Sequence, residues 1–227
     1  MEECKLSILI PVLNEEETIE RCIKKAQKYL KENQINGEVL ISDNGSTDNS
    51  VNLAKKLGAR VISTKEKGYG NALINGINHA KGKYIIMADA DDSYDLENLD
   101  SFYKNLEKGY DFVIGNRFKG GIEKGAMKIS HKIGVRFLSW VGRIACKCDV
   151  YDFHCGIRGL NTKKFQELNL KEPGMEFASE MIVKAAKAKL SILEVPTTLA
   201  KDGRKKGGSH LNTVRDGFRH LNYLIKA

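Results

Sequence analysis

The chain has 227 residues, of which 41% are hydrophobic and 29% charged, which suits one globular domain with a buried core. Lysine and arginine outnumber aspartate and glutamate by 37 to 29, so an anionic partner is favoured, but the basic residues are spread along the chain and we expect no nucleic-acid partner. The five cysteines include no CxxC pair, which argues against a disulfide framework or a structural zinc site and fits reduced thiols in the cytoplasm.

Short apolar strands alternate with amphipathic helices in the first part of the chain. We expect strands at 6–12, 39–43, 60–63, 84–88 and 111–115, and helices at about 16–33, 48–57, 68–79 and 96–106. Ser46 or Thr47 is the expected N-cap of the second helix. The alternation predicts an α/β fold with a mainly parallel central sheet, right-handed crossovers and helices on both faces.

The pattern becomes less regular after residue 118. We expect a glycine- and lysine-rich loop at 119–125, a long helix at 127–147, a strand at 155–160, a helix at 176–187, a strand at 191–195 and a final helix at 211–225. No internal repeat or low-complexity linker divides the chain, so we expect 1–227 to be one domain. We expect neither a signal peptide nor a membrane span, because no stretch reaches roughly 18 apolar residues.

Acidic residues follow the buried strand at 84–88. Asp89 and Asp91 lie two residues apart and repel each other unless a hard cation or a solvated loop accommodates them. We therefore expect this pair to hold a divalent metal ion that carries a phosphate-bearing substrate. Asp92 and Asp95 are expected to shape or cap the loop instead.

Polar residues also follow the first and second strands. Asn14 and Glu15 end the first, and Asp43 to Ser46 end the second. Because the carboxyl ends of parallel strands meet at one edge of the sheet, these residues and the acidic pair should converge on one cleft. Asp43 could accept hydrogen bonds from a base or ribose, and Gly45 would bring backbone N–H groups near a ligand. The alternative is an Asx-type turn that caps the next helix.

Several well-known site motifs are absent from the sequence. It contains no GxxxxGK[ST] P-loop, no GxSxG elbow and no HExxH zinc motif. Gly68-Tyr69-Gly70 follows the third strand and lacks the third glycine of a Rossmann dinucleotide fingerprint. A receiver domain would carry an acidic pair after its first strand, where this chain has Asn14-Glu15.

A set of motifs in a fixed order resembles family 2 glycosyltransferases of the GT-A fold, close to the polyprenyl-phosphate (dolichol-phosphate) mannose and glucose synthases. The motifs extend over nearly the whole chain. They are Ile10-Pro11-Val12-Leu13-Asn14-Glu15, Ser42-Asp43-Asn44-Gly45-Ser46-Thr47-Asp48, Lys67-Gly68-Tyr69-Gly70-Asn71-Ala72, Ala88-Asp89-Ala90-Asp91, Gly115-Asn116-Arg117, Asp152-Phe153-His154-Cys155-Gly156-Ile157-Arg158-Gly159 and Glu194-Val195-Pro196.

The resemblance implies a nucleotide-diphospho-sugar transferase fold with a donor-binding half at 1–118 and an acceptor-side half at 119–227. Asp89 and Asp91 would form the DxD motif that binds Mg²⁺ or Mn²⁺, and the ion would bridge the donor diphosphate. The donor itself would be bound by Pro11, Asn14, Glu15, Asp43, Gly45, Lys67, Gly70, Asp89, Ala90 and Arg204. Asp92-Ser93 stands where a Leu-Gln pair is common in the mannose synthases, so GDP-mannose and UDP-glucose types of donor, and UDP-N-acetylhexosamine, all stay open.

The chemistry of the acceptor decides which residues it needs. A phosphate monoester, with a second pKa of about 6, is already an anion and attacks without a general base, whereas a sugar hydroxyl needs one. A phosphate acceptor therefore calls for cations, with Arg117 as the catalytic candidate beside Asp91 and with His131 and Lys132 next. Glu176 and Glu180, four residues apart, are candidates for contacts to the acceptor, or for the base if the acceptor is a hydroxyl.

The helix expected at 127–147 is amphipathic and contains the only tryptophan. Its apolar stripe is flanked by lysines and arginines and consists of Ile129, Ile133, Phe137, Trp140, Val141 and Ile144. Such a helix is typical of a membrane-interface element, and the alternative is a helix that faces the core. The basic, glycine-rich segment 201–210 could grip phosphates, and we expect Arg204 to close over the donor diphosphate.

These observations predict a metal-dependent, inverting transferase that moves a hexose from a nucleotide-sugar to a polyprenyl or dolichyl phosphate. It would act as a peripheral protein on the cytoplasmic face of a membrane. The alternatives are a family 2 glycosyltransferase with a hydroxyl acceptor and a nucleotide-sugar-binding module without turnover.

Overall fold

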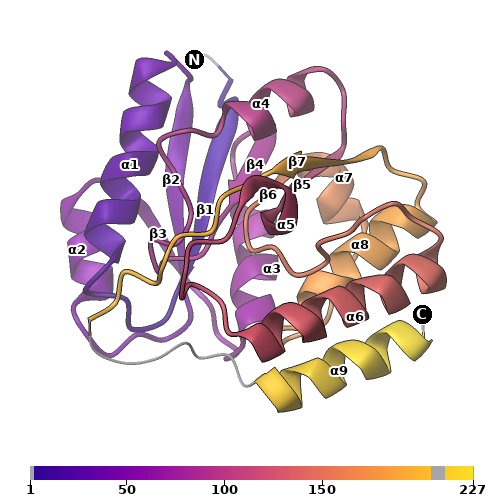
Figure 1. The fold of residues 1–227 in the computed structure, drawn as a ribbon. Helices are drawn as coiled ribbons and strands as arrows, with labels where there is room; N and C mark the ends of the chain where they lie inside the picture. Colours follow the sequence, from indigo (N-terminus) through magenta and orange to yellow (C-terminus); the bar gives the residue numbers. More distant parts are fainter. Residues whose placement is uncertain (1–2, 206–212, 227) are drawn as a thin grey trace.

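The computed structural model describes residues 3–205 and 213–226, which form an α/β fold around a seven-stranded sheet (Figure 1). The strand order is β3-β2-β1-β4-β6-β5-β7. The strands are β1 Leu6–Val12, β2 Gly37–Asp43, β3 Arg60–Ser63, β4 Tyr84–Met87, β5 Phe112–Asn116, β6 Arg158–Asn161 and β7 Ile192–Pro196. β6 runs antiparallel to both of its neighbours, and every other pairing is parallel. The predicted fold class and its mainly parallel sheet are confirmed.

Helices pack around this sheet and, in most places, fall where the apolar spacing predicts them. They are α1 Ile19–Glu32, α2 Ser50–Lys56, α3 Tyr69–His79, α4 Asp100–Glu107, α5 Arg117–Gly120, α6 Ile129–Cys146, α7 Thr162–Glu167, α8 Phe177–Lys187 and α9 Thr213–Lys226. The short helices α5 and α7 were not expected. The first two residues of the predicted final helix, 211 and 212, lie outside the described residues.

The core lies at the centre of the sheet. Every residue of β1 and of β4 is buried, and for β4 the apolar run at 84–88 predicts this. Val12 is in register with Asp43, and Leu9 with Met87. The carboxyl ends of β1, β2 and β4 therefore deliver their loops to one edge of the sheet.

The predicted cap of α2 is wrong. The helix begins at Ser50, and its first turn is held by Asp48, whose Oδ1 accepts the Ser50 N–H at 2.9 Å. The Ser46 hydroxyl instead accepts the backbone N–H of Asn14 at 3.0 Å. A hydroxyl side chain that the sequence pattern assigns to a local cap is thus used to tie two loops together.

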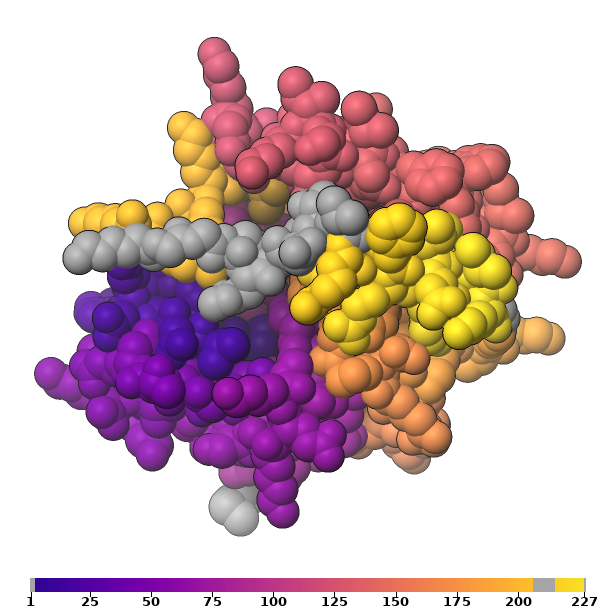
Figure 2. Space-filling view, turned by 90° about the horizontal axis from the view of Figure 1, so that it is seen from below, coloured from indigo at the N-terminus to yellow at the C-terminus, as the bar shows by residue number. Residues whose placement is uncertain are grey.

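Helix α6 turns its apolar stripe outward. Ile129, Ile133, Phe137, Trp140 and Ile144 are between 52% and 76% exposed, while the helix packs inward through Val135, Ser139 and Gly142. The core-facing alternative is therefore wrong for these five residues, whereas Val141, the sixth of the stripe, packs against the core. Figure 2 shows α9 lying between α6 and α8 on this face, and α9 adds the exposed side chains of Phe218 and Ile225. None of the helices described is long and apolar enough to cross a bilayer.

Candidate active site

The loops after β1, β2 and β4 converge on a pocket, as the topology predicts. We call it the outer pocket. It is lined by Pro11, Val12, Leu13, Glu15, Asn44, Tyr69, Ala72, Asp89, Ala90, Asp91, Met175 and Arg204. Five of the residues expected to bind the donor or metal through the strand-end motifs are in this lining, and Arg204 reaches it from the C-terminal part of the chain.

Asn14 and Asp43 do not line the outer pocket, but their side chains accept hydrogen bonds from the backbone of the loops that border it. Asn14 has a φ of 58°, and its side-chain oxygen accepts the Thr47 N–H at 2.8 Å. The Asp43 carboxylate accepts the N–H groups of Gly45 and Ser46, both at 3.1 Å. Asp43 thus forms the Asx-type turn that the sequence left open as an alternative to contact with a base. These bonds fix the backbone that borders the pocket.

Arg204 lies between two acidic side chains of the outer pocket. Its guanidinium contacts Glu15 at 3.0 Å and lies 3.6 Å from Asp91, and Asp202 holds it at 2.7 Å. Burial raises the pKa of Glu15 to about 7, although the Arg204 charge opposes the rise. The contacts place one arginine across the mouth of the acidic site. The rest of the predicted basic loop, residues 206–210, lies outside the described residues.

The acidic pair is held by neighbours of different kinds. Asp89 accepts a hydrogen bond of 2.8 Å from the Tyr69 hydroxyl, and Asp91 accepts the Ser93 hydroxyl at 2.6 Å. Burial, and then repulsion from Asp91, raises the pKa of Asp89 to about 6. The nearby acid Asp92 is ion-paired with Arg21 and with a lysine of α1, at 2.9 and 2.7 Å, so it belongs to the loop.

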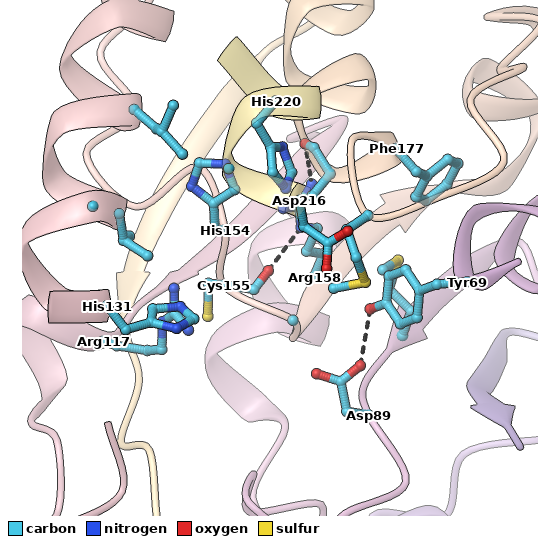
Figure 3. A pocket seen from close by; sticks show the side chains of 18 of the residues that line it. Tyr69, Asp89, Arg117, His131, His154, Cys155, Arg158, Phe177, Asp216 and His220 are labelled. Carbon is cyan, nitrogen blue, oxygen red and sulfur yellow. Dashed lines mark hydrogen bonds between the residues drawn. The ribbon is translucent and has the colours of Figure 1, made fainter. Parts of the chain in front are cut away.

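A second cavity of about 190 Å³ lies beyond Asp89, between the sheet and helices α6, α8 and α9 (Figure 3). We call it the inner pocket. Tyr69, Asp89 and Met175 line both pockets, so the two meet at the first carboxylate of the acidic pair. Apolar side chains such as Val135 and Phe177 contribute to the inner wall, together with several basic groups.

Two buried arginines line the inner pocket. Arg117, the expected catalytic cation, is paired with Asp152 through bonds of 2.8 and 2.7 Å, so its charge is largely balanced. Arg158 donates to the carbonyl oxygens of Phe153, Cys155 and Ala178 at 2.6, 2.9 and 2.9 Å. Carbonyls do not cancel the charge of a guanidinium, so Arg158 supplies a positive field in the cavity.

Three histidines surround the same cavity, and only His131 was expected. The His154 and His220 rings meet edge to face at 4.3 Å, and His220 shares a hydrogen bond of 2.9 Å with Ser179. Both ring nitrogens of His154 are enclosed and lack a hydrogen-bond partner within the described part of the chain. Burial, the largest cause, lowers the pKa of all three rings, and brings that of His220 to about 4.

Within the described part of the chain, the remaining predicted residues line neither pocket. The Glu180 carboxylate accepts the N–H groups of Lys171 and Glu172 and pairs with Lys184 at 2.8 Å, while Glu176 pairs with Arg219. Gly70 packs against the segment 172–174. Gly45, Lys67 and Lys132 also lie outside both linings.

Several residues of the site escaped the sequence-based assignment, among them Tyr69, His154, Arg158 and His220. The first three stand inside quoted motifs, but a motif does not tell which of its side chains points at a carboxylate or into a cavity. His220 comes from the last helix, far along the chain, and the sequence offers no signal for its pairing with His154.

The fold and the acidic pair after β4 are those expected of a sugar transferase, and a comparison with family models identifies the family. The model described as glycosyl transferase family 2 matches residues 7–169, which is most of the chain. The chain belongs to this family, and the predicted family is thereby confirmed.

Among curated relatives, a low-salt glycan biosynthesis hexosyltransferase of Haloferax volcanii is 35% identical over 222 residues, covering 97% of this chain and 53% of that protein. A dolichol-phosphate mannosyltransferase of Pyrococcus furiosus is 27% identical over 98% of this chain and 64% of its own length. The chain thus spans about half to two thirds of the length of these relatives.

A solved structure shares the fold. Glucosyl-3-phosphoglycerate synthase from Mycobacterium tuberculosis, in complex with Mn²⁺, UDP-glucose and phosphoglyceric acid, superposes with a TM-score of 0.78 at 20% identity. The match covers 98% of this chain and 80% of the other.

Proposed function

We propose that the protein is a metal-dependent, inverting hexosyltransferase that uses a nucleoside-diphosphate sugar as donor and a polyprenyl or dolichyl phosphate as acceptor. The observation that carries the proposal is the meeting of two pockets at Asp89. The outer pocket holds the acidic pair and Arg204, while the inner one is lined by the two buried arginines Arg117 and Arg158. A sugar bound at this junction would have its diphosphate on one side and the acceptor on the other.

The residues of the outer pocket fit a divalent ion. Carboxylate oxygens are the ligands that Mg²⁺ and Mn²⁺ prefer, and Mg²⁺ is commonly held by one or two carboxylates together with substrate phosphates and water. The described residues contain no group of three acidic, histidine or cysteine side chains able to hold a metal alone, which fits a site that the substrate completes. The bound ion would neutralise charge on the leaving diphosphate. Asp89 and Asp91 would hold it, and Arg204 would turn from Glu15 and Asp91 to the phosphates.

A phosphate acceptor fits the inner pocket better than a hydroxyl acceptor that relies on the two expected bases. Glu176 and Glu180 are engaged in ion pairs away from the pocket. A phosphate needs no base, and the buried Arg158, whose charge no carboxylate of the described residues pairs with, would favour an anion there. Asp216 of α9 is an acid of the inner lining, so it is the residue on which a hydroxyl acceptor would depend.

The exposed stripe of α6 supports contact with a membrane surface. Five large apolar side chains face outward and basic residues flank them, as in helices that lie in a bilayer interface. The other side of α6 lines the inner pocket through His131, Val135 and Leu138. A lipid phosphate could thus pass from the bilayer to the pocket along one helix. We place the protein peripherally on the cytoplasmic face.

A binding panel tests the donor and the metal. We expect GDP-mannose, UDP-glucose or UDP-N-acetylglucosamine to raise the melting temperature, and only in the presence of Mn²⁺ or Mg²⁺. Asp91→Asn should abolish the metal-dependent part of the rise. Stabilisation that is equal with and without metal would contradict a metal-dependent site.

An acceptor variant separates the two reaction types. Asp216→Asn should leave transfer to a phosphate acceptor within a few-fold of the wild-type rate, because no proton has to be removed. A loss of about 10²-fold or more, the size typical of a missing general base, would contradict a transfer that needs no base.

A further inference from the structure

The two glycines at the start of α3 allow an unusually close approach between backbones. A Cβ atom on Gly68 would lie 2.2 Å from the Pro173 carbonyl oxygen, and one on Gly70 would lie 2.0 Å from that of Glu172. The Gly70 N–H donates to the Pro173 oxygen at 2.9 Å. Gly68 also has a φ of 139°, which side chains rarely tolerate. The first turn of α3 is therefore pressed against the segment 172–174.

This contact determines where the residue between the glycines points. Tyr69 lines both pockets, and its hydroxyl donates to Oδ1 of Asp89 at 2.8 Å (Figure 3). An apolar side chain at this position would fill the same wall but would leave that oxygen without its donor.

The second oxygen of the same carboxylate is held by packing. A Cβ atom on Gly156 would lie 2.2 Å from Oδ2 of Asp89. Gly156 is itself fixed, because its N–H donates to the Tyr94 hydroxyl at 2.9 Å. Asp89 is thus oriented through both oxygens, by α3 on one and by the segment before β6 on the other.

We propose that Tyr69 is a positioning residue for the divalent ion of the donor site. The inference rests on the proposed function, because it assumes that Asp89 and Asp91 hold that ion. The phenol fixes the rotation of the Asp89 carboxylate, so a bound ion would be held by an oxygen that is already oriented. Hydrogen bonds to a ligating carboxylate commonly change metal affinity by about 10–100-fold.

The test compares Tyr69→Phe with Tyr29→Phe. Tyr29 donates the same kind of bond, at 3.1 Å, to Asp100 on α4, outside both pockets, so it is a matched control. Mn²⁺ affinity is measured by electron paramagnetic resonance, with and without GDP or UDP. Nucleotide binding is measured separately in the presence of a metal chelator, and the melting temperature of each variant is recorded. We expect Tyr69→Phe to weaken Mn²⁺ binding about tenfold or more. Metal-free nucleotide binding should not change, and Tyr29→Phe should bind Mn²⁺ like the wild type.

Unchanged Mn²⁺ affinity in Tyr69→Phe would overturn the inference while leaving the proposed function intact. If the wild-type protein itself bound no Mn²⁺ with either nucleotide, the metal-dependent function would fail as well. Should Tyr69→Phe lower the melting temperature, Gly156→Ala tests the same carboxylate from its other oxygen. That variant should also weaken Mn²⁺ binding, and wild-type affinity in it would contradict the inference.

Discussion

At the scale of single residues, one arginine of the outer pocket offsets the charge of the acidic side chains around it. Asp91 and Glu15 carry like charges, and Arg204 approaches both. The positive charge of Arg204 offsets these two negative charges in the ligand-free site. In the proposed complex it would lie where the donor diphosphate brings further negative charge. The same group can therefore serve the protein before binding and the donor afterwards.

Replacing Arg204 should weaken donor binding. A hydrogen bond to a charged group contributes about 1.5–3 kcal/mol, so Arg204→Ala should raise the KM for the nucleotide-sugar roughly tenfold or more. Lys201→Ala is the matched control, since Lys201 lies in the same segment but pairs with the exposed Glu123 at 3.8 Å. Steady-state kinetics measure both, and unchanged kinetics in Arg204→Ala would count against its role.

Glu15 should make the ligand-free protein less stable as the pH rises. Its pKa in the folded protein is about 7, above the ordinary value of 4.5, so the folded state holds the proton more tightly than the unfolded state. The stabilising effect is complete below about pH 4.5 and is lost as the pH rises through 7. Glu15→Gln should remove this loss. The difference in the free energy of unfolding between variant and wild type should therefore favour the variant by about 2 kcal/mol more at pH 8 than at pH 5. Denaturant unfolding at both values measures it, and equal differences at pH 5 and pH 8 would contradict the burial of an ionisable Glu15.

At the scale of secondary-structure elements, apolar runs predicted most of the fold. The strands β1 and β4 are buried on both sides, so their sequences are almost wholly apolar and easy to recognise. β6 is different, because its four residues begin with Arg158 and their antiparallel direction is set by pairing with β4 and β5. Long-range pairing of this kind leaves no local pattern, and α7 was missed because six residues carry too little periodicity.

The residues of the site divide in the same way, into those that a local sequence pattern predicts and those that only long-range contacts bring together. The sequence predicted the place of four residues at the sheet edge, because the carboxyl ends of parallel strands meet there. They are Asp89, Asp91, Glu15 and Pro11. The partner of Arg117 could not be predicted, since Asp152 lies 35 residues away and only the folded chain joins them. The same holds for the bond between Tyr69 and Asp89, whose residues stand on different elements.

Helix α6 should bind the protein to anionic membranes. Burial of a large apolar side chain contributes about 1.5–3 kcal/mol, so Phe137→Ser with Trp140→Ser should reduce binding to vesicles of phosphatidylserine and phosphatidylcholine by at least about tenfold. Glu32→Ser, at the end of α1 and away from α6 in Figure 1, is the control. Vesicle co-sedimentation at low salt gives the comparison. No binding of the wild-type protein would contradict the interfacial role of α6.

At the scale of the whole molecule, one sheet joins the two halves of the chain. β6 and β7 come from the second half and pair with β4 and β5 of the first. The loops of the outer pocket and the helices of the inner pocket are therefore built on one framework, and Asp89 lies where the two pockets meet. We propose that residues 1–227 act as a single catalytic domain for this reason.

The central claim is transfer of a hexose to a lipid phosphate at the junction of the two pockets. The most direct measurement incubates the protein with Mn²⁺, a labelled nucleotide-sugar and either a short polyprenyl phosphate or the corresponding polyprenol. We predict a labelled polyprenyl-phosphate hexose, with inverted anomeric configuration, from the phosphate and no product from the alcohol. Transfer to the alcohol or to a glycan hydroxyl, with none to the phosphate, would contradict the claim, and so would donor binding without turnover.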